Sequence, residues 1–323
     1  MPRRSTLLSV GYIAVAMQLC AMNNVPVAGL ADSPSTFANP VVDANFADPA
    51  LLNDNGVYYA YATNSRRGDH LQAQMSTDLG HWSPLADPLP VMPTWANPGK
   101  TWAPDVTMIK HGKRYVIYFA ADDKRTHKQA IGVAVATKPE GPYTPVDEPL
   151  IEQADIGGAI DPCCYVGRRG ERYLVWKNDG NSMNVDTWIW IQKLSKDGTR
   201  LVGDPVKTIK QDQPWEGNLV EGPCLWKHGS KYYLFYSANA YVDCRYAMGY
   251  AVADDLMVPY RKPSTSPWVA SLDGQCGPGG CDIERGVDGT EWMVYHTWAK
   301  GPHSYRSMSI KRLEWDGDVP VLK

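Results

Sequence analysis

Asp48-Pro49-Ala50-Leu51 is followed, ten residues after its first member, by the aromatic and apolar run Tyr58-Tyr59-Ala60-Tyr61. This pair of signals recurs four more times, at intervals of about 56 to 61 residues. The later copies open with a carboxylate at Asp105, Asp161, Glu221 and Asp282. A repeat of this length, made of short segments with strand-like composition, is typical of β-propellers.

Turn residues separate the segments within each repeat. Asp54-Asn55-Gly56 and Lys110-His111-Gly112-Lys113 are examples of turns between a first and a second strand. An alternating segment such as residues 130–135 then supplies a third strand, and no stretch of useful length has helical periodicity. The sequence therefore predicts an all-β, five-bladed β-propeller formed by a single domain over residues 32–323.

This fold has a functional consequence, because the innermost strands of all blades converge on one axis. Asp48, Asp161 and Glu221 occupy similar places in the first, third and fourth repeats. We therefore expect their side chains to lie on the innermost strands and to meet at one site.

Composition limits the classes of partner. The chain has 323 residues, 44% of them apolar, and a formal net charge of −3. It lacks the clustered basic face that phosphate backbones require, so we expect no nucleic acid and no membrane partner. Eighteen Tyr and twelve Trp against four Phe favour rings with polar edges, which suit either sugar contacts or packing between blades.

The N-terminus resembles a targeting segment. Pro2-Arg3-Arg4 gives a positive start, residues 7–22 are mostly apolar, and Gly29 and Ala31 are placed like a cleavage site. We therefore predict a signal peptide over residues 1–31 and a secreted protein, extracellular or periplasmic.

Cysteine usage agrees with export. Removal of residues 1–31 leaves six of the seven cysteines, an even number, which suggests at least two disulfides. Spacing favours a Cys276–Cys281 pair across the Gly277–Gly280 segment and places Cys224 and Cys244 near neighbouring strand ends. Cys163 and Cys164 are open to two interpretations, a vicinal disulfide or two free buried thiols.

A cluster of carboxyl groups suits the cleavage of glycosidic bonds. That reaction needs one carboxylic acid to protonate the leaving oxygen and one carboxylate to activate water or to attack carbon. Crowded like charges raise the pKa of at least one member, which keeps an acid protonated near neutrality. Glu221 has the longest reach and is the natural proton donor.

Six motifs in order resemble glycoside hydrolase family 43 across nearly all of the chain after residue 31. The segments that carry the resemblance are Asn39-Pro40-Val41-Val42 with Phe46-Ala47-Asp48-Pro49, Trp102-Ala103-Pro104-Asp105-Val106, Ala159-Ile160-Asp161-Pro162, Val220-Glu221-Gly222-Pro223, Gly277-Pro278-Gly279-Gly280 with Tyr295-His296-Thr297-Trp298, and Arg306 through Trp315-Asp316-Gly317-Asp318. The resemblance implies an inverting mechanism in which Asp48 is the general base and Glu221 the general acid. Asp161 would tune the proton affinity and orientation of the acid.

Two positions depart from the pattern of the family. Asp282 stands where an uncharged polar residue is more usual, and Cys163-Cys164 replaces a small or apolar pair. Neither change removes a catalytic group, but both affect the shape of the pocket.

Further residues are expected to bind substrate or metal. Trp102 and Trp215 are candidates for stacking on sugar, and Asp105, His296 and Arg306 are candidates for polar contacts. The resemblance also implies a central metal or water site at His296. Any metal there would be a structural, hydrated Ca²⁺ at the propeller axis, and no cofactor is required for the chemistry.

The substrate class follows from the resemblance. We expect a monomer that acts on arabinose- or xylose-containing oligosaccharides or polysaccharides, and an exo-acting α-L-arabinofuranosidase fits best. An endo-1,5-α-L-arabinanase and a β-xylosidase are alternatives within the family. A non-catalytic carbohydrate-binding propeller is the alternative of another class. A retaining, invertase-like enzyme is disfavoured, because Ala47, Ile160 and Gly222 stand where its pattern has Asn, Arg and Cys.

Overall fold

The computed structural model describes Met1, residues 38–272 and residues 274–323. The predicted signal peptide, apart from Met1, lies outside the described residues. The described residues from 38 onward are almost entirely β-strand and turn. They include three short 3-10 helices, η1 (Ala154–Ile156), η2 (Gly180–Met183) and η3 (Pro214–Glu216). None of the described residues form a helix long and apolar enough to span a bilayer.

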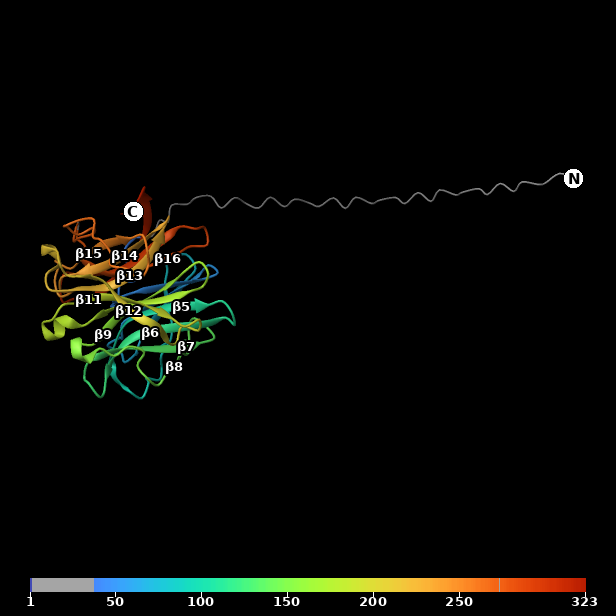
Figure 1. The fold of residues 1–323 in the computed structure, drawn as a ribbon, viewed down its shortest axis with the longest axis horizontal. Coiled ribbons are helices and arrows are strands. Elements are labelled where there is room, and N and C mark those ends of the chain that lie inside the picture. Colours follow the sequence, from blue (N-terminus) through green and yellow to red (C-terminus); the bar gives the residue numbers. More distant parts are fainter. Residues whose placement is uncertain (2–37, 273) are drawn as a thin grey trace. The chain divides into compact units, whose positions relative to one another are not determined.

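The strands form five antiparallel sheets that follow one another in chain order (Figure 1). Blade 1 contains β1 (Ala50–Asp54), β2 (Val57–Ala62), β3 (Gln72–Ser76) and β4 (Ser83–Pro84). Blade 2 contains β5 (Ala96–Ile109), β6 (Arg114–Asp123), β7 (Gln129–Ala136) and β8 (Thr144–Pro145). Blade 3 contains β9 (Ala159–Val166), β10 (Arg172–Asn178), β11 (Trp188–Leu194) and β12 (Leu201–Lys210).

The last two blades complete the ring. Blade 4 contains β13 (Val220–His228), β14 (Lys231–Ala238) and β15 (Ala247–Ala253). Blade 5 contains β16 (Cys276–Arg285), β17 (Glu291–Trp298), β18 (Arg306–Asp316) and β19 (Val319–Leu322). The inner strands β1, β5, β9, β13 and β16 contact one another in sequence, and β1 also contacts β16. This confirms the predicted five-bladed β-propeller.

The segment before β1 closes the ring by joining blade 5. Val42 forms a bridge with Met308 of β18. Asn39 adds two hydrogen bonds, since its amide donates to the carbonyl of Ile310 and its side-chain oxygen accepts from the Ile310 N–H, both at 2.8 Å. Because these contacts join residues about 270 positions apart, they hold the first and last blades together.

The core lies between the blades and is built largely from second strands. Tyr115, Tyr118, Phe119, Tyr233 and Phe235 are fully buried there. The second strands are apolar on both faces, because each sheet is covered by a neighbouring blade on either side. For this reason their aromatic runs stand out in the sequence.

The inner strands share a backbone irregularity at the mouth of the ring. Asp48, Ala103, Asp161, Gly222 and Gly280 all have positive φ, between 41° and 56°. The pairing register shifts next to this position in β5, β9, β13 and β16. A bulge of this kind redirects the neighbouring side chains, and it is frequent beside active sites.

This register corrects part of the predicted equivalence of the five carboxylates. Asp48 and Asp161 do occupy the same backbone position, whereas Glu221 precedes it by one residue. Asp105 and Asp282 follow it by two residues and therefore match Ala50, Cys163 and Cys224. Pro follows the left-handed residue in four of the copies, whereas Cys281 follows Gly280 and leaves the fifth copy without this marker. Asp161 and Glu221 lie on innermost strands as predicted, but Asp48 lies two residues before β1 begins.

The predicted disulfides are wrong in pairing and in number. Cys244 is bonded to Cys276, and Cys163, Cys164, Cys224 and Cys281 are free thiols. Cys276 and Cys281 both belong to β16, where five residues of extended chain span roughly 15 Å. A disulfide requires Cα atoms within about 7 Å, so the segment between the two cysteines would have to be a turn rather than a strand.

A thiol titration checks this pairing. A chain that begins after residue 31 has six cysteines, so the single disulfide leaves four thiols. Denatured, unreduced protein should therefore titrate four thiols, rising to six after reduction. Two or fewer thiols before reduction would show that a further disulfide exists.

Candidate active site

A cavity of about 410 Å³ lies at the mouth of the ring and is lined by residues from all five blades. Asp48, Asp161 and Glu221 all line it, together with Trp102, Asp105 and Arg306. Its volume is within the range of sites for small ligands. The cavity therefore places the three predicted catalytic carboxyl groups in one compartment.

Asp48 is held as a carboxylate. Arg306 donates from Nη1 to its Oδ1 at 3.1 Å, and Thr63 donates from Oγ1 to its Oδ2 at 2.8 Å. Burial disfavours the charge, but Arg306, His296 and Thr63 outweigh it and hold the pKa of Asp48 well below its usual range. Asp48 is therefore ionised at every pH at which the protein is expected to work, as a proton acceptor must be.

Gly280 makes this arrangement possible. A Cβ at this position would lie 2.8 Å from Nδ1 of His296 and 2.9 Å from Oδ1 of Asp48. Both contacts are closer than side-chain carbons normally approach, and the φ of 56° also favours glycine. Gly280 of the sequence motif thus leaves room for the side chains of Asp48 and His296.

Asp161 and Glu221 form a second, differently charged group. The N–H of Gly222 donates to Oδ2 of Asp161 at 2.8 Å, which ties β9 to β13 beside Glu221. Burial, and then the charge of Glu221, raise the pKa of Asp161 to about 7, although Lys177 opposes this shift. Asp161 therefore retains a proton close to neutral pH, beside the carboxyl group of Glu221.

Lys177 is a member of the site that the sequence reasoning missed. It lies in β10, its side chain is 1% exposed, and its Nζ donates to Oε2 of Glu221 at 2.9 Å and to Oδ1 of Asp179 at 3.3 Å. Burial lowers the pKa of Lys177, but the negative charges of Glu221, Asp179 and Asp161 outweigh burial. The pKa is therefore raised overall, and the ammonium stays charged. The available signal was a lysine directly after the apolar run of residues 173–176.

Replacing Lys177 should be costly. In Lys177→Met the side chains of Glu221 and Asp179 lose a buried cation, and breaking a buried ion pair from one side costs about 3–5 kcal/mol. We expect a loss of unfolding free energy of that order in denaturant titrations. Lys193→Met, at an exposed position of β11, is the control and should lie within about 0.5 kcal/mol of the wild type. Equal stability of Lys177→Met and Lys193→Met would contradict the buried ion-pair network.

The other predicted binding residues divide into two groups. Trp102, Asp105 and Arg306 line the cavity. Trp215 does not line it, because its ring stacks on Tyr236 with ring centroids 6.0 Å apart and packs in the core between blades. His296 does not line it either, because it is fully buried in β17 behind Gly280.

His296 has one nitrogen without a partner among the described residues. The N–H of Asp48 donates to Nδ1 at 3.2 Å, and Nε2 is buried without a hydrogen bond. A neutral ring that accepts at Nδ1 carries its proton on Nε2, which can donate to a water but cannot bind a cation. The predicted metal site at His296 therefore requires the other tautomer, in which Nδ1–H faces Oδ1 of Asp48 at 3.3 Å. No cluster of three or more His, Cys, Asp or Glu in the described ranges is arranged as a metal centre, so a cation there would keep most of its ligands as water.

The floor of the cavity holds a second layer of ionisable groups. Asp105 is buried and Asp282 is partly buried, and removal from solvent is the main cause that raises both pKa values, that of Asp282 to about 6. Cys224 donates from Sγ to Oδ1 of Asp282 at 3.6 Å. Backbone N–H groups of Cys164 and Leu51 donate to Asp105 and Asp282, which ties these carboxyl groups into the structure.

Fold and site together place the chain in the class of five-bladed glycosidase propellers, which gather their carboxyl groups at one axial cavity. The comparison with known families agrees: residues 37–320 match the glycosyl hydrolases family 43. The chain belongs to this family, which confirms the resemblance seen in the sequence.

Individual relatives share this architecture. The chain is 27% identical over 316 residues to the extracellular exo-α-(1→5)-L-arabinofuranosidase of Streptomyces avermitilis, covering 91% of this chain and 63% of that protein. It is 32% identical over 212 residues to a probable arabinan endo-1,5-α-L-arabinosidase A of Aspergillus flavus, covering 62% and 61% of the two chains. The chain thus spans less than two thirds of the length of either relative.

A solved structure agrees over a larger share of its own length. The crystal structure of a thermostable family-43 glycoside hydrolase has a TM-score of 0.81 and 28% identity, covering 89% of this chain and 96% of that one. The match therefore extends over the whole ring of blades.

Proposed function

We propose that this protein is an inverting glycoside hydrolase that releases L-arabinofuranosyl units from the ends of arabinose-containing oligosaccharides or polysaccharides. The observation that carries the proposal is the different environment of the three carboxyl groups in one cavity. Arg306 bonds to Asp48 and holds its pKa low, whereas Asp161 lies beside Glu221 and has a pKa raised to about 7. An inverting glycosidase needs one ionised base and one protonated acid at the same pH.

The proposed reaction is a single displacement. Asp48 accepts a proton from a water molecule, whose oxygen forms the new bond to the anomeric carbon. Glu221 gives its proton to the glycosidic oxygen as the bond to the leaving group breaks. Lys177 then faces the new carboxylate of Glu221 and stabilises it, and exchange with solvent returns one proton to Glu221 and removes one from Asp48.

Exo action is the favoured mode. The carboxyl groups lie in a cavity bounded by loops of several blades, and the Streptomyces relative is named as an exo-acting enzyme. The Aspergillus relative is named as an endo-acting one, so endo-arabinanase activity is the second candidate. β-Xylosidase activity and non-catalytic carbohydrate binding are the remaining alternatives.

A substrate screen tests the proposal. We expect hydrolysis of 4-nitrophenyl α-L-arabinofuranoside, and release of arabinose alone from linear and branched arabinan. A ladder of oligosaccharides would indicate endo action, and preference for 4-nitrophenyl β-D-xyloside would indicate a xylosidase. Tight binding without hydrolysis of any pentoside would contradict the catalytic proposal.

The role of Asp161 predicts a shift in pH dependence. The alkaline limb of the kcat/KM profile reports the loss of the catalytic proton, and the crowding of two carboxyl groups raises the affinity of the site for that proton. Asp161→Asn removes one of these ionisable groups while Lys177 remains, so the alkaline limb should move to lower pH. Asparagine tolerates the positive φ of 55° at this position, which favours a folded variant. An unchanged limb would contradict this role.

We also propose that the protein acts outside the cytoplasm as a monomer. The Cys244–Cys276 disulfide is typical of an oxidising compartment, and the Streptomyces relative is named as extracellular. Fractionation of cells that express the full chain checks the location, and light scattering checks the monomer.

A further inference from the structure

The segment between β14 and β15 forms one wall of the cavity. Residues 239–246 connect these strands, and Ala240, Tyr241, Val242 and Tyr246 from this segment line the cavity. We call residues 239–246 the blade 4 loop. It lies outside the ring of inner strands that carries Asp161 and Glu221.

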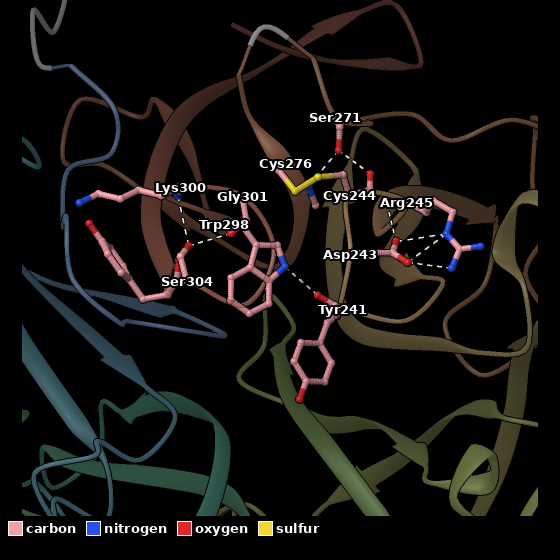
Figure 2. Close-up of a disulfide and its surroundings, with 12 residues drawn as sticks. Tyr241, Asp243, Cys244, Arg245, Ser271, Cys276, Trp298, Lys300, Gly301 and Ser304 are labelled. Atoms are coloured by element: carbon pink, nitrogen blue, oxygen red, sulfur yellow. Dashed lines mark hydrogen bonds and ion pairs between the residues drawn. A yellow bond between two sulfur atoms is a disulfide. The ribbon is translucent and has the colours of Figure 1, made fainter.

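Several bonds fix the blade 4 loop to blade 5. The Cys244–Cys276 disulfide joins it to β16, and Trp298 donates from Nε1 to the carbonyl of Tyr241 at 2.8 Å. Figure 2 shows the Trp298 indole directed at the backbone of Tyr241, beside the disulfide. Ser271 donates to the carbonyl of Cys244 at 2.6 Å and accepts from the N–H of Gly277 at 2.9 Å. The wall is therefore held in place before substrate arrives.

Tyr241 is the exposed aromatic residue of this wall. It is 45% exposed, although its ring stacks on Trp298 with ring centroids 6.5 Å apart. The guanidinium carbon of Arg306 lies 4.7 Å from the centre of the Tyr241 ring. Within the described residues the Tyr241 hydroxyl makes no hydrogen bond. A large ring held rigid and left half exposed in a sugar-sized cavity is suited to contact a ligand at little entropic cost.

The position of the ring indicates which sugar it contacts. Arg306 bonds to Asp48 on one side and stacks on Tyr241 on the other, so the guanidinium separates the ring from the catalytic base. The sugar that is cleaved must lie between Asp48 and Glu221. We propose that Tyr241 is a specificity-determining residue that binds a second sugar unit, next to the one that is cleaved. This inference rests on the proposed function.

Comparison of a short and a long substrate tests the inference. The readout is the kcat/KM for arabinotriose divided by that for methyl α-L-arabinofuranoside, whose leaving group is too small to replace a second sugar unit. Tyr241→Ala should lower this ratio about 3- to 10-fold, mainly through a higher KM for arabinotriose, because an aromatic contact of this kind contributes about 0.5–1.5 kcal/mol. Tyr241→Phe keeps the ring and should restore the ratio. Tyr173→Ala, in β10 outside the cavity lining, is the control and should leave it unchanged.

The disulfide provides an independent variant. Cys244→Ser combined with Cys276→Ser frees the blade 4 loop and should lower the same ratio by a smaller factor than Tyr241→Ala. Cys164→Ser is the matched control, because Cys164 is a free thiol away from this loop.

Two other outcomes separate this inference from the proposed function. An equal fall of kcat on both substrates in Tyr241→Ala would mean that Tyr241 acts only through Arg306, and it would overturn the inference. A wild type that hydrolyses neither substrate would refute the proposed function instead. Calorimetric titration with arabinotriose would then decide the inference, because equal affinity of the wild type and Tyr241→Ala would overturn it.

Discussion

Asp48→Asn is expected to abolish activity on every substrate, whatever the leaving group. The amide cannot accept the proton of the attacking water, and general base catalysis typically contributes about 10²–10⁴-fold. Asparagine is the closest replacement in shape, and it tolerates the φ of 53° at this position. The loss should therefore appear in kcat for both nitrophenyl arabinoside and arabinan. The variant should be folded at the assay temperature, although its thermal midpoint should fall because Arg306 loses its carboxylate partner.

The control for Asp48 is the aspartate six residues further along the chain, at the end of β1. Asp54 ends β1 and accepts a hydrogen bond from the hydroxyl of Tyr115 at 2.8 Å, away from the cavity lining. Asp54→Asn should retain activity. Substantial activity of Asp48→Asn on any substrate would show that another group activates the water.

Glu221→Gln is expected to show a loss that depends on the leaving group. A glutamine has no proton to give, so kcat on arabinan should fall about 10²–10⁴-fold. Dinitrophenyl arabinoside, whose leaving group departs without protonation, should be hydrolysed at a rate much closer to that of the wild type. This contrast distinguishes an acid from a residue that only shapes the site.

Glu284 offers a matched control for Glu221. It lies in β16, it is largely buried, and burial raises its pKa to about 7, but it is not part of the cavity lining. Glu284→Gln should leave the two rates in their wild-type ratio. An equal loss on both substrates in Glu221→Gln would assign the acid role elsewhere, and Asp161 would be the next candidate.

The fold was predictable because the signals for it are local and repeated. Each aromatic run, such as Tyr115–Tyr118, is buried on both faces of its blade, so its composition reports the strand without knowledge of the neighbours. The turn residues between first and second strands, such as Asn55-Gly56, act over a few positions only. Five copies of such signals define the ring.

The site was predictable in part. Asp48, Asp161 and Glu221 line one cavity as expected, because the inner strands converge. The positions of the five carboxylates relative to one another were not predicted. Asp105 lies two residues beyond the position that Asp161 occupies, and the bulges beside these residues arise from pairing between strands. Lys177 was missed for a similar reason: its partners Glu221 and Asp179 lie on different segments, and only the packed structure brings them together.

The disulfide shows where spacing along the chain is a poor guide. Cys244 and Cys276 are 32 residues apart, whereas Cys276 and Cys281 are close in sequence but lie along one extended strand. A pairing across two blades depends on which strand ends meet in space. The same contact fixes the wall that carries Tyr241.

The stereochemistry of the first product tests the central claim most directly. Proton NMR of 4-nitrophenyl α-L-arabinofuranoside with a high concentration of enzyme, recorded before the released sugar mutarotates, identifies the anomer that forms first. A single displacement with Asp48 as base predicts β-L-arabinofuranose as the initial product. Initial release of the α-anomer would mean that a carboxylate attacks the anomeric carbon to form a covalent intermediate, and it would contradict the inverting mechanism.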